Sequence, residues 1–171
     1  MDKQELVDKV EHCNSKQSAL ILADLLIKQP TLINIIFDMM EKEVDKKHWK
    51  AAWIFDHVYD ANKKLIDPYL DRMIPLFTNT RSSSIQRIVG KLLSFYDINN
   101  KIDGVFINTC FDMLISPTVP VAVKVHAMQL IYNTTSIFPE LKSELKLTIE
   151  EHIPNNSVGF KSRAKKLLKK L

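Results

Sequence analysis

The sequence has few of the residues that interrupt helices. It has only three glycines in 171 residues, and long stretches contain no helix breaker. A turn-rich all-β fold needs many such residues, so their scarcity favours helices. Loops that hold phosphate groups with glycines are not expected either, because the sequence has no P-loop, G-x-G-x-x-G or G-x-S-x-G motif.

Cysteine is equally scarce. Cys13 and Cys110 are the only two cysteines, and they form no C-x-x-C pair. Each lies in an apolar stretch with helical spacing, which predicts buried, reduced thiols rather than a disulfide framework. Reduced thiols fit an intracellular compartment, so we expect a cytoplasmic protein.

Long hydrophobic runs and metal-binding patterns are also missing. No apolar run reaches membrane-spanning length, and the start, MDKQELVDKVEH, is too charged for a secretion signal. We therefore expect no membrane partner. The histidines have no ligand spacing such as H-E-x-x-H, which predicts neither a metal site nor a cofactor. They are His12, His48, His57, His126 and His152.

The apolar residues that are present recur with helical spacing. Leu32, Ile36, Met39 and Met40 are one such series, in which the spacing is three or four residues. Prolines stand where helices are expected to begin, a position that tolerates the missing N–H. These prolines are Pro30, Pro68, Pro120 and Pro139.

The helical pattern repeats about every 37 residues. The segments KAAWIF, IVGKLL, HAMQLI and RAKKLL align, and their anchor residues are 38, 38 and 37 residues apart. The anchors are Ala51, Val89, Ala127 and Ala164. The helices that precede these segments repeat with nearly the same period, and their aligned residues are 38, 36 and 35 residues apart. These residues are Ile36, Ile74, Cys110 and Leu145. Such a period indicates stacked helical hairpins that bury one another's apolar faces.

The segment PVAVKVHAMQLIYNTTSIFPELKSELKLTIEEHIP, residues 120–154, carries a further signal. Its second helix has a basic-x-x-Ala-x-x-Leu pattern, formed by Lys124, Ala127 and Leu130, and Pro-Glu-Leu opens the next helix. In these features the chain resembles the HEAT-repeat family of α-solenoids. The resemblance implies an all-α fold, a right-handed α-α superhelix of about five antiparallel helical pairs.

The predicted organisation is one solenoid domain over residues 1–171. Residues 1–29 form a degenerate capping pair, in which Lys16, Ala19 and Leu22 echo the motif. The predicted repeats are 30–66, 67–102, 103–138 and 139–171.

The last segment, GFKSRAKKLLKKL, has six basic residues and no acidic one. Its apolar residues share one helix face, so we expect the segment to dock as the last second helix. These residues are Phe160, Ala164, Leu167, Leu168 and Leu171. The alternative is a free amphipathic helix that binds a membrane surface.

Charge separates between the two helices of each pair. The predicted first helices (31–43, 67–78, 103–116 and 139–151) hold eleven acidic and four basic residues. The predicted second helices (46–59, 81–95, 119–135 and 157–171) hold thirteen basic and one acidic residue. In HEAT proteins the second helices line the concave surface, so the resemblance implies a basic concave face. The alternative is solvated charge that serves solubility.

The register identifies candidate binding residues on the side opposite the apolar stripe of Ala51, Ile54, Phe55 and Val58. The predicted partner- or nucleic-acid-binding residues are Trp49, Trp53, Asp56, Arg87, Lys91, Gln129, Tyr132, Lys165, Lys166 and Lys169. Aromatic rings beside basic groups suit stacked bases or partner side chains. The alternative is that the two indoles pack against a neighbouring helix or subunit.

One enzymatic interpretation deserves comparison. The HEAT-like DNA alkylpurine glycosylases place a tryptophan, an aspartate one turn later and an arginine one repeat onward. Trp49 and Arg87 match two of these positions, but Trp53 stands where the aspartate is needed, and Asp56 lies a further turn away. We therefore expect no catalytic residues.

The sequence thus predicts a non-catalytic interaction module for a protein partner. A nucleic-acid-binding protein is the alternative, with a glycosylase as its less favoured enzymatic version. The sequence leaves the oligomeric state open.

Overall fold

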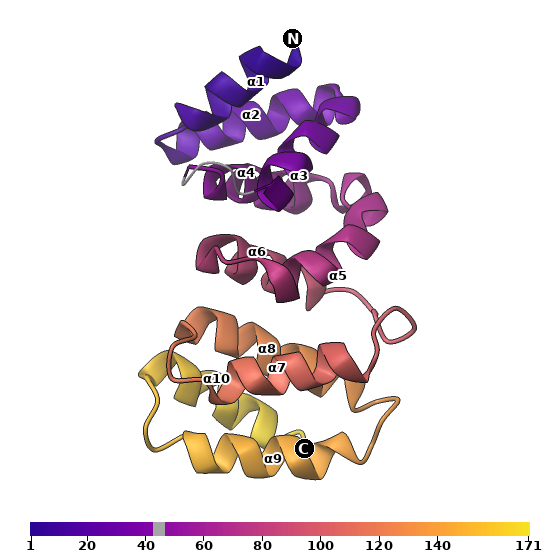
Figure 1. Ribbon diagram of the computed structural model, residues 1–171, viewed down its shortest axis with the longest axis vertical. Coiled ribbons are helices and arrows are strands. Elements are labelled where there is room, and N and C mark those ends of the chain that lie inside the picture. Colours follow the sequence, from indigo (N-terminus) through magenta and orange to yellow (C-terminus); the bar gives the residue numbers. More distant parts are fainter. Residues whose placement is uncertain (43–46) are drawn as a thin grey trace. The chain divides into compact units, whose positions relative to one another are not determined.

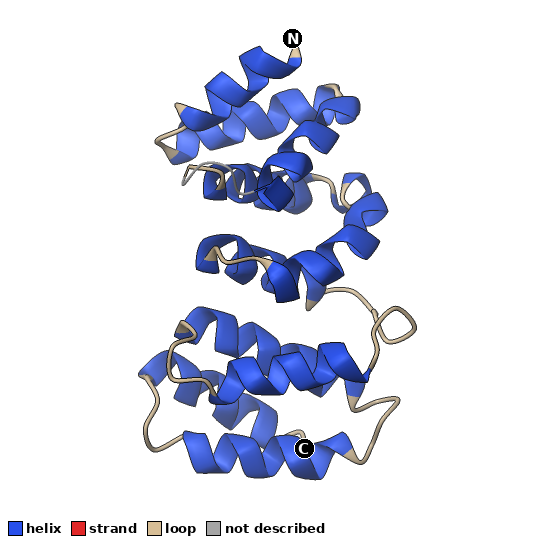
Figure 2. Ribbon diagram, in the orientation of Figure 1, coloured by secondary structure: helices blue, strands red, loops and turns tan. Residues whose placement is uncertain are grey.

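A computed structural model describes residues 1–42 and 47–171. All regular structure in these two ranges is helical, which confirms the all-α prediction (Figures 1 and 2). The predicted helix boundaries at residues 43 and 46 lie outside the described residues.

The α-helices follow the predicted order of first and second helices. They are α1 (Lys3–Glu11), α2 (Lys16–Lys28), α3 (Ile33–Lys42), α4 (Trp49–Ala61), α5 (Leu70–Asn79), α6 (Ser83–Leu93), α7 (Gly104–Ile115), α8 (Val121–Thr134), α9 (Leu141–His152) and α10 (Val158–Leu168). Short 3₁₀ helices precede α3 and α5. They are η1 (Pro30–Leu32), η2 (Lys63–Leu65) and η3 (Asp67–Tyr69).

Local sequence signals set several of these helix ends. Ser15 and Ser18 form a reciprocal capping box at the start of α2. Asp103 caps α7 by accepting the N–H of Phe106, and Ser157 caps α10 by accepting the N–H of Phe160. Pro120 is the N-cap residue of α8, as its position in the sequence predicts.

The chain forms two compact units, residues 1–89 and 90–171, and α6 contains the boundary. We describe each unit by itself, and the prediction of one continuous solenoid domain stays a prediction.

In the first unit, α4 packs against both α2 and α3, and α1 contacts α3 and α4. The centre of the unit is aromatic. The ring of Phe37 lies 5.4 Å from that of Phe55 and 5.1 Å from that of Tyr69, measured between centroids. These contacts join α3, α4 and η3 into one core.

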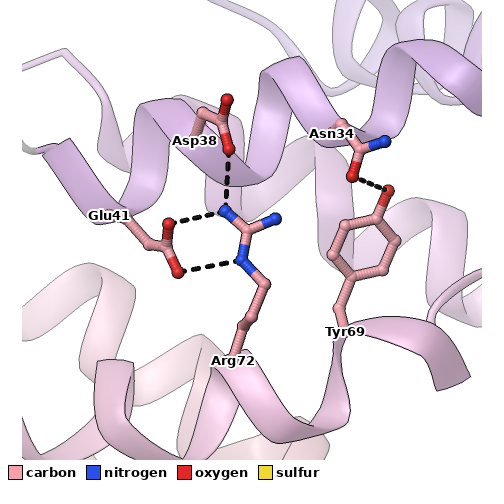
Figure 3. A network of polar contacts seen from close by, with 5 residues as sticks. All are labelled: Asn34, Asp38, Glu41, Tyr69 and Arg72. Atoms are coloured by element: carbon pink, nitrogen blue, oxygen red, sulfur yellow. Dashed lines mark hydrogen bonds and ion pairs between the residues drawn. The ribbon is translucent and has the colours of Figure 1, made fainter.

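A polar network lies at the edge of this core (Figure 3). Arg72 on α5 donates to Asp38 at 2.7 Å and to the two carboxylate oxygens of Glu41 at 3.1 and 2.6 Å. Its guanidinium carbon lies 4.6 Å from the ring centre of Phe37. Tyr69 donates to Asn34 at 3.0 Å. The network joins α3 to the helix that opens the next pair.

In the second unit, α8 packs against α7, α9 and α10. The last segment docks as predicted, because Phe160, Ala164 and Leu167 on α10 are buried. Leu168 and Leu171 remain half-exposed. The C-terminal segment is therefore a packed helix of this unit.

Both cysteine thiols are buried and free, as predicted. Burial raises the pKa of the Cys110 thiol to about 12.

Among the described residues, no single helix is long and apolar enough to cross a membrane. The segments Lys16–Lys28 and Pro30–Lys42 would suffice together by length and composition, but they are bent by 116° at their junction.

Candidate interaction surface

The two tryptophans form a stacked pair on α4. Their ring centres lie 6.1 Å apart with an interplanar angle of 25°. Trp49 is 39% exposed and Trp53 is half-buried, whereas the four residues of the predicted apolar stripe are fully buried. The stripe prediction is therefore confirmed, and the indoles lie outside the core of α4.

A histidine extends this aromatic row. The ring of His57 lies 5.9 Å from that of Trp53. Its Nε2 atom is buried and has no hydrogen-bond partner among residues 1–42 and 47–171, and the same holds for Nδ1 of His48, just before α4. The described part of the chain contains no group of three or more His, Cys, Asp or Glu residues that could hold a metal ion.

The helix α2, which packs against α4, also has an exposed apolar side chain, and this residue is not among the predicted site residues. Ile21 on α2 is 60% exposed. It follows the motif residue Ala19 by two positions, as Trp53 follows Ala51. The helices α2 and α4 pack against each other, and this register position is apolar on the first and aromatic on the second. Comparing Ala19 with Ala51 would have revealed Ile21.

Two lysines of the second helices are buried within the fold. Lys50 is buried on α4, where its ammonium group donates to the carbonyl of Glu11 at 2.7 Å and to the side chain of Asn14 at 2.6 Å. Lys124 is buried on α8, and desolvation lowers its pKa. Neither lysine contributes an exposed charge to a binding surface.

Gln129 also makes contacts within the fold. Its amide nitrogen donates to Asn133 at 2.8 Å, and its amide oxygen accepts from Arg163 at 2.8 Å. Asn133 in turn donates to the carbonyl of Ser94 at 3.1 Å. Gln129 thus belongs to a polar ladder that joins the end of α6 to α8 and α10. This ladder could not be predicted from the residue pattern, because its members are 34 and 39 residues apart.

The other predicted residues differ in exposure. Arg87 is exposed on α6, while Asp56, Lys91 and Tyr132 are half-buried. Lys165, Lys166 and Lys169 are exposed at the end of α10. The structure therefore brings Trp49 and Trp53 together on α4 and gathers the three lysines at α10.

The observed helix bounds weaken the charge separation. The first helices α3, α5, α7 and α9 hold seven acidic and four basic residues, and the second helices α4, α6, α8 and α10 hold eight basic and two acidic residues. Half of those basic residues belong to α10. Residues 1–89 contain thirteen acidic and thirteen basic residues, so the net charge of +4 lies in residues 90–171. The tryptophans and the excess positive charge thus belong to different units.

Residues 3–171 match a family model described as a HEAT repeat domain. The chain therefore belongs to the HEAT repeat family, and its helical pairs are repeats of that solenoid class. Repeats of this family act in general as protein-interaction scaffolds. Comparisons with curated proteins and with solved structures gave no match.

Proposed function

We propose that this chain is a non-catalytic interaction module that binds a protein partner through the surface around Trp49 and Trp53. The observation that carries the proposal is the stacked indole pair, with Trp49 exposed, on a helix whose opposite face is buried. Large aromatic side chains outside the core are the residues that most often dominate protein interfaces.

The remaining chemistry of this surface supports a protein rather than a small molecule. Exposed Ile21 stands at the equivalent register position of α2, which packs against α4, and by register we assign Asp56 of α4 and Arg87 of α6, two groups of opposite sign, to the same surface. An apolar centre with mixed polar groups around it is the usual anatomy of a protein interface. By the family resemblance, we propose that this surface lies on the concave side, and we propose a cytoplasmic setting.

Site-specific photo-crosslinking tests the proposal. A photoreactive phenylalanine derivative is placed at position 49 and, as a control, at position 147, where an exposed leucine stands on α9. We expect position 49 to crosslink to a discrete protein in cells and position 147 not to do so. Equal labelling from both positions, or none from position 49, would contradict the proposal.

Fluorescence gives an independent readout. Both tryptophans of the sequence lie on this surface, so their emission reports directly on its occupancy. Mixing the chain with the purified crosslinked protein should shift the emission, and Trp49→Ala should weaken binding. Unchanged emission at saturation would place the interface elsewhere.

Nucleic acid is the second candidate partner, and the exposed lysines of α10 favour it. Each phosphate contact makes binding weaken as salt rises. We would titrate the chain into labelled single- and double-stranded DNA at low and physiological salt, following anisotropy and tryptophan emission. Salt-sensitive binding with an emission change would put the polyanion at the indoles, and binding without one would favour α10. Flat curves at both salt concentrations would exclude this candidate.

A glycosylase remains the less favoured enzymatic version. Trp53, which stacks on Trp49, stands at the position where the alkylpurine glycosylases need a carboxylate. Asp56 already interacts with another group of the chain. Base release from alkylated DNA that disappears in Asp56→Asn would support this activity. Release that persists in that variant would exclude Asp56 as its catalytic residue.

A further inference from the structure

The second unit contains an apolar pocket that is separate from the tryptophan surface. Its volume is about 240 Å³, and its walls come from the start of α7 and the start of α9. Ile102, Ile107, Phe138 and Leu141 supply its apolar surface. Sites for drug-sized ligands and cofactors occupy roughly 300–1,000 Å³. This pocket therefore suits a large amino-acid side chain better than a cofactor.

Exposed apolar residues lie next to the pocket in the sequence. Val105 on α7 is 71% exposed, and Ile137, just before α9, is 59% exposed. Ile137 lies in a hydrogen-bonded turn, since the N–H groups of Ile137 and Phe138 both donate to the carbonyl of Thr134 at 3.0 Å. An apolar pocket beside exposed apolar residues is typical of a protein-binding site.

The polar groups of the pocket select the charge of its occupant. Asp103, Glu140 and Asn108 line it, and no lysine or arginine does. One oxygen of Asp103 accepts the N–H of Phe106 at 2.9 Å. Glu140 and Asn108 have no side-chain hydrogen bond or ion pair with the described residues. Lys101 and Lys142 are close in sequence but stand outside the lining.

We propose that this pocket binds a peptide segment of a partner protein that inserts one large apolar side chain and places a lysine or arginine beside Asp103 and Glu140. The apolar walls account for the inserted side chain. The two carboxylates account for the adjacent cation, because complementary charge steers and orients partners.

Gly104 lines the pocket and offers a position from which it can be filled. Apart from its neighbours in the chain and the backbone of its own helix, a Cβ atom at this position would meet no atom within 4 Å. Gly104 is the first residue of α7, where replacing glycine reduces the freedom of the unfolded chain and favours the helix. Gly104→Leu should therefore occupy the pocket in a stable protein.

The test uses three short synthetic peptides of the same length, titrated into the ¹⁵N-labelled chain. The first flanks Leu-Phe with lysine and arginine, the second flanks it with glutamates, and the third flanks Ser-Ser with lysine and arginine. We expect the first peptide to shift the amide signals of residues 103–108 and 138–141 at millimolar concentration. The other two should bind roughly tenfold more weakly or not at all.

The variants complete the test. Gly104→Leu should abolish the shifts, Glu140→Gln should weaken binding of the first peptide, and Leu147→Ser, an exposed apolar residue on α9 outside the pocket lining, should change nothing. Absence of shifts with the first peptide, equal binding of the glutamate peptide, or full binding by Gly104→Leu would each overturn the proposal. A dimer that Gly104→Leu dissociates in sedimentation experiments would show instead that a second copy of the chain occupies the pocket.

Discussion

At the scale of single residues, Arg72 joins two successive helical pairs through one guanidinium group. It makes a two-pronged contact with Glu41, a further contact with Asp38 and a cation–π contact with Phe37. These interactions raise its pKa, chiefly through the hydrogen bond with Glu41. Two-pronged contacts of arginine with carboxylates are stronger and more directional than single ion pairs of lysine.

Replacing this arginine should therefore lower stability. Arg72→Ala removes all of these contacts and leaves two carboxylates side by side. We expect the free energy of unfolding to fall by about 1–2 kcal/mol, a value limited by the partial exposure of the side chain. Urea denaturation measures the change, and Arg72→Lys should recover only part of it. A loss no larger than that of Arg87→Ala, an exposed arginine, would contradict this role.

Lys124 gives a second prediction at this scale, because burial lowers its pKa. Between this lowered pKa and 10.5 the unfolded chain binds more protons than the folded chain, so stability should rise with pH across that window. Lys124→Met removes the buried charge and should stabilise the fold by about 1 kcal/mol at neutral pH. The advantage should shrink toward pH 10.5, which urea denaturation of both proteins can follow. A constant difference would argue against a desolvated ammonium group.

At the scale of helices, α10 is fixed by one buried face. Phe160 and Ala164 are fully buried, and the exposed lysines lie at its C-terminal end. Truncating a buried phenylalanine leaves a cavity, whereas truncating a half-exposed leucine does not.

Phe160→Ala should accordingly destabilise the protein by about 3–5 kcal/mol. Leu168→Ala on the same helix is the matched control, and it should cost clearly less because Leu168 is half-exposed. Thermal and urea unfolding measure both losses. Similar losses in the two variants would contradict the docked geometry of α10.

Helices were the most predictable feature of this chain. Ala51, Val89, Ala127 and Ala164 recur every 37 or 38 residues, and each is fully buried, because the spacing of small or branched residues reports directly on helix packing. The roles of Lys50 and Gln129 could not be predicted in this way. Their partners, such as Asn14 and Arg163, are 36 and 34 residues away, and periodicity does not tell which polar side chains meet. The candidate site was therefore predicted less completely than the fold.

At the scale of the whole chain, the net charge of +4 lies in residues 90–171. Four basic residues on α10 account for much of this excess. Local charge density, rather than total charge, decides how strongly a protein is held by a polyanion.

A charge-matched pair of variants separates these two quantities. In the first variant, glutamine replaces Lys165, Lys166 and Lys169, which lowers the net charge from +4 by three. In the second, glutamine replaces the exposed Lys16, Lys28 and Lys42, which lowers the net charge by the same amount. We expect the first variant to elute from a polyanionic resin at clearly lower salt than the second. Identical elution would mean that α10 has no special role in contacts with polyanions.

The polar contacts between successive pairs also bear on how the chain folds. Asn14–Lys50, Asn34–Tyr69, Asp38–Arg72, Ser94–Asn133 and Gln129–Arg163 each connect residues 34 to 39 positions apart, about one repeat. Chains with internal repeats can misfold by pairing the wrong neighbours. A hairpin stacked out of order would leave these polar groups without their partners, which carries a free-energy cost. We therefore expect these contacts to favour the stacking of each hairpin on its neighbour in the sequence over stacking out of order.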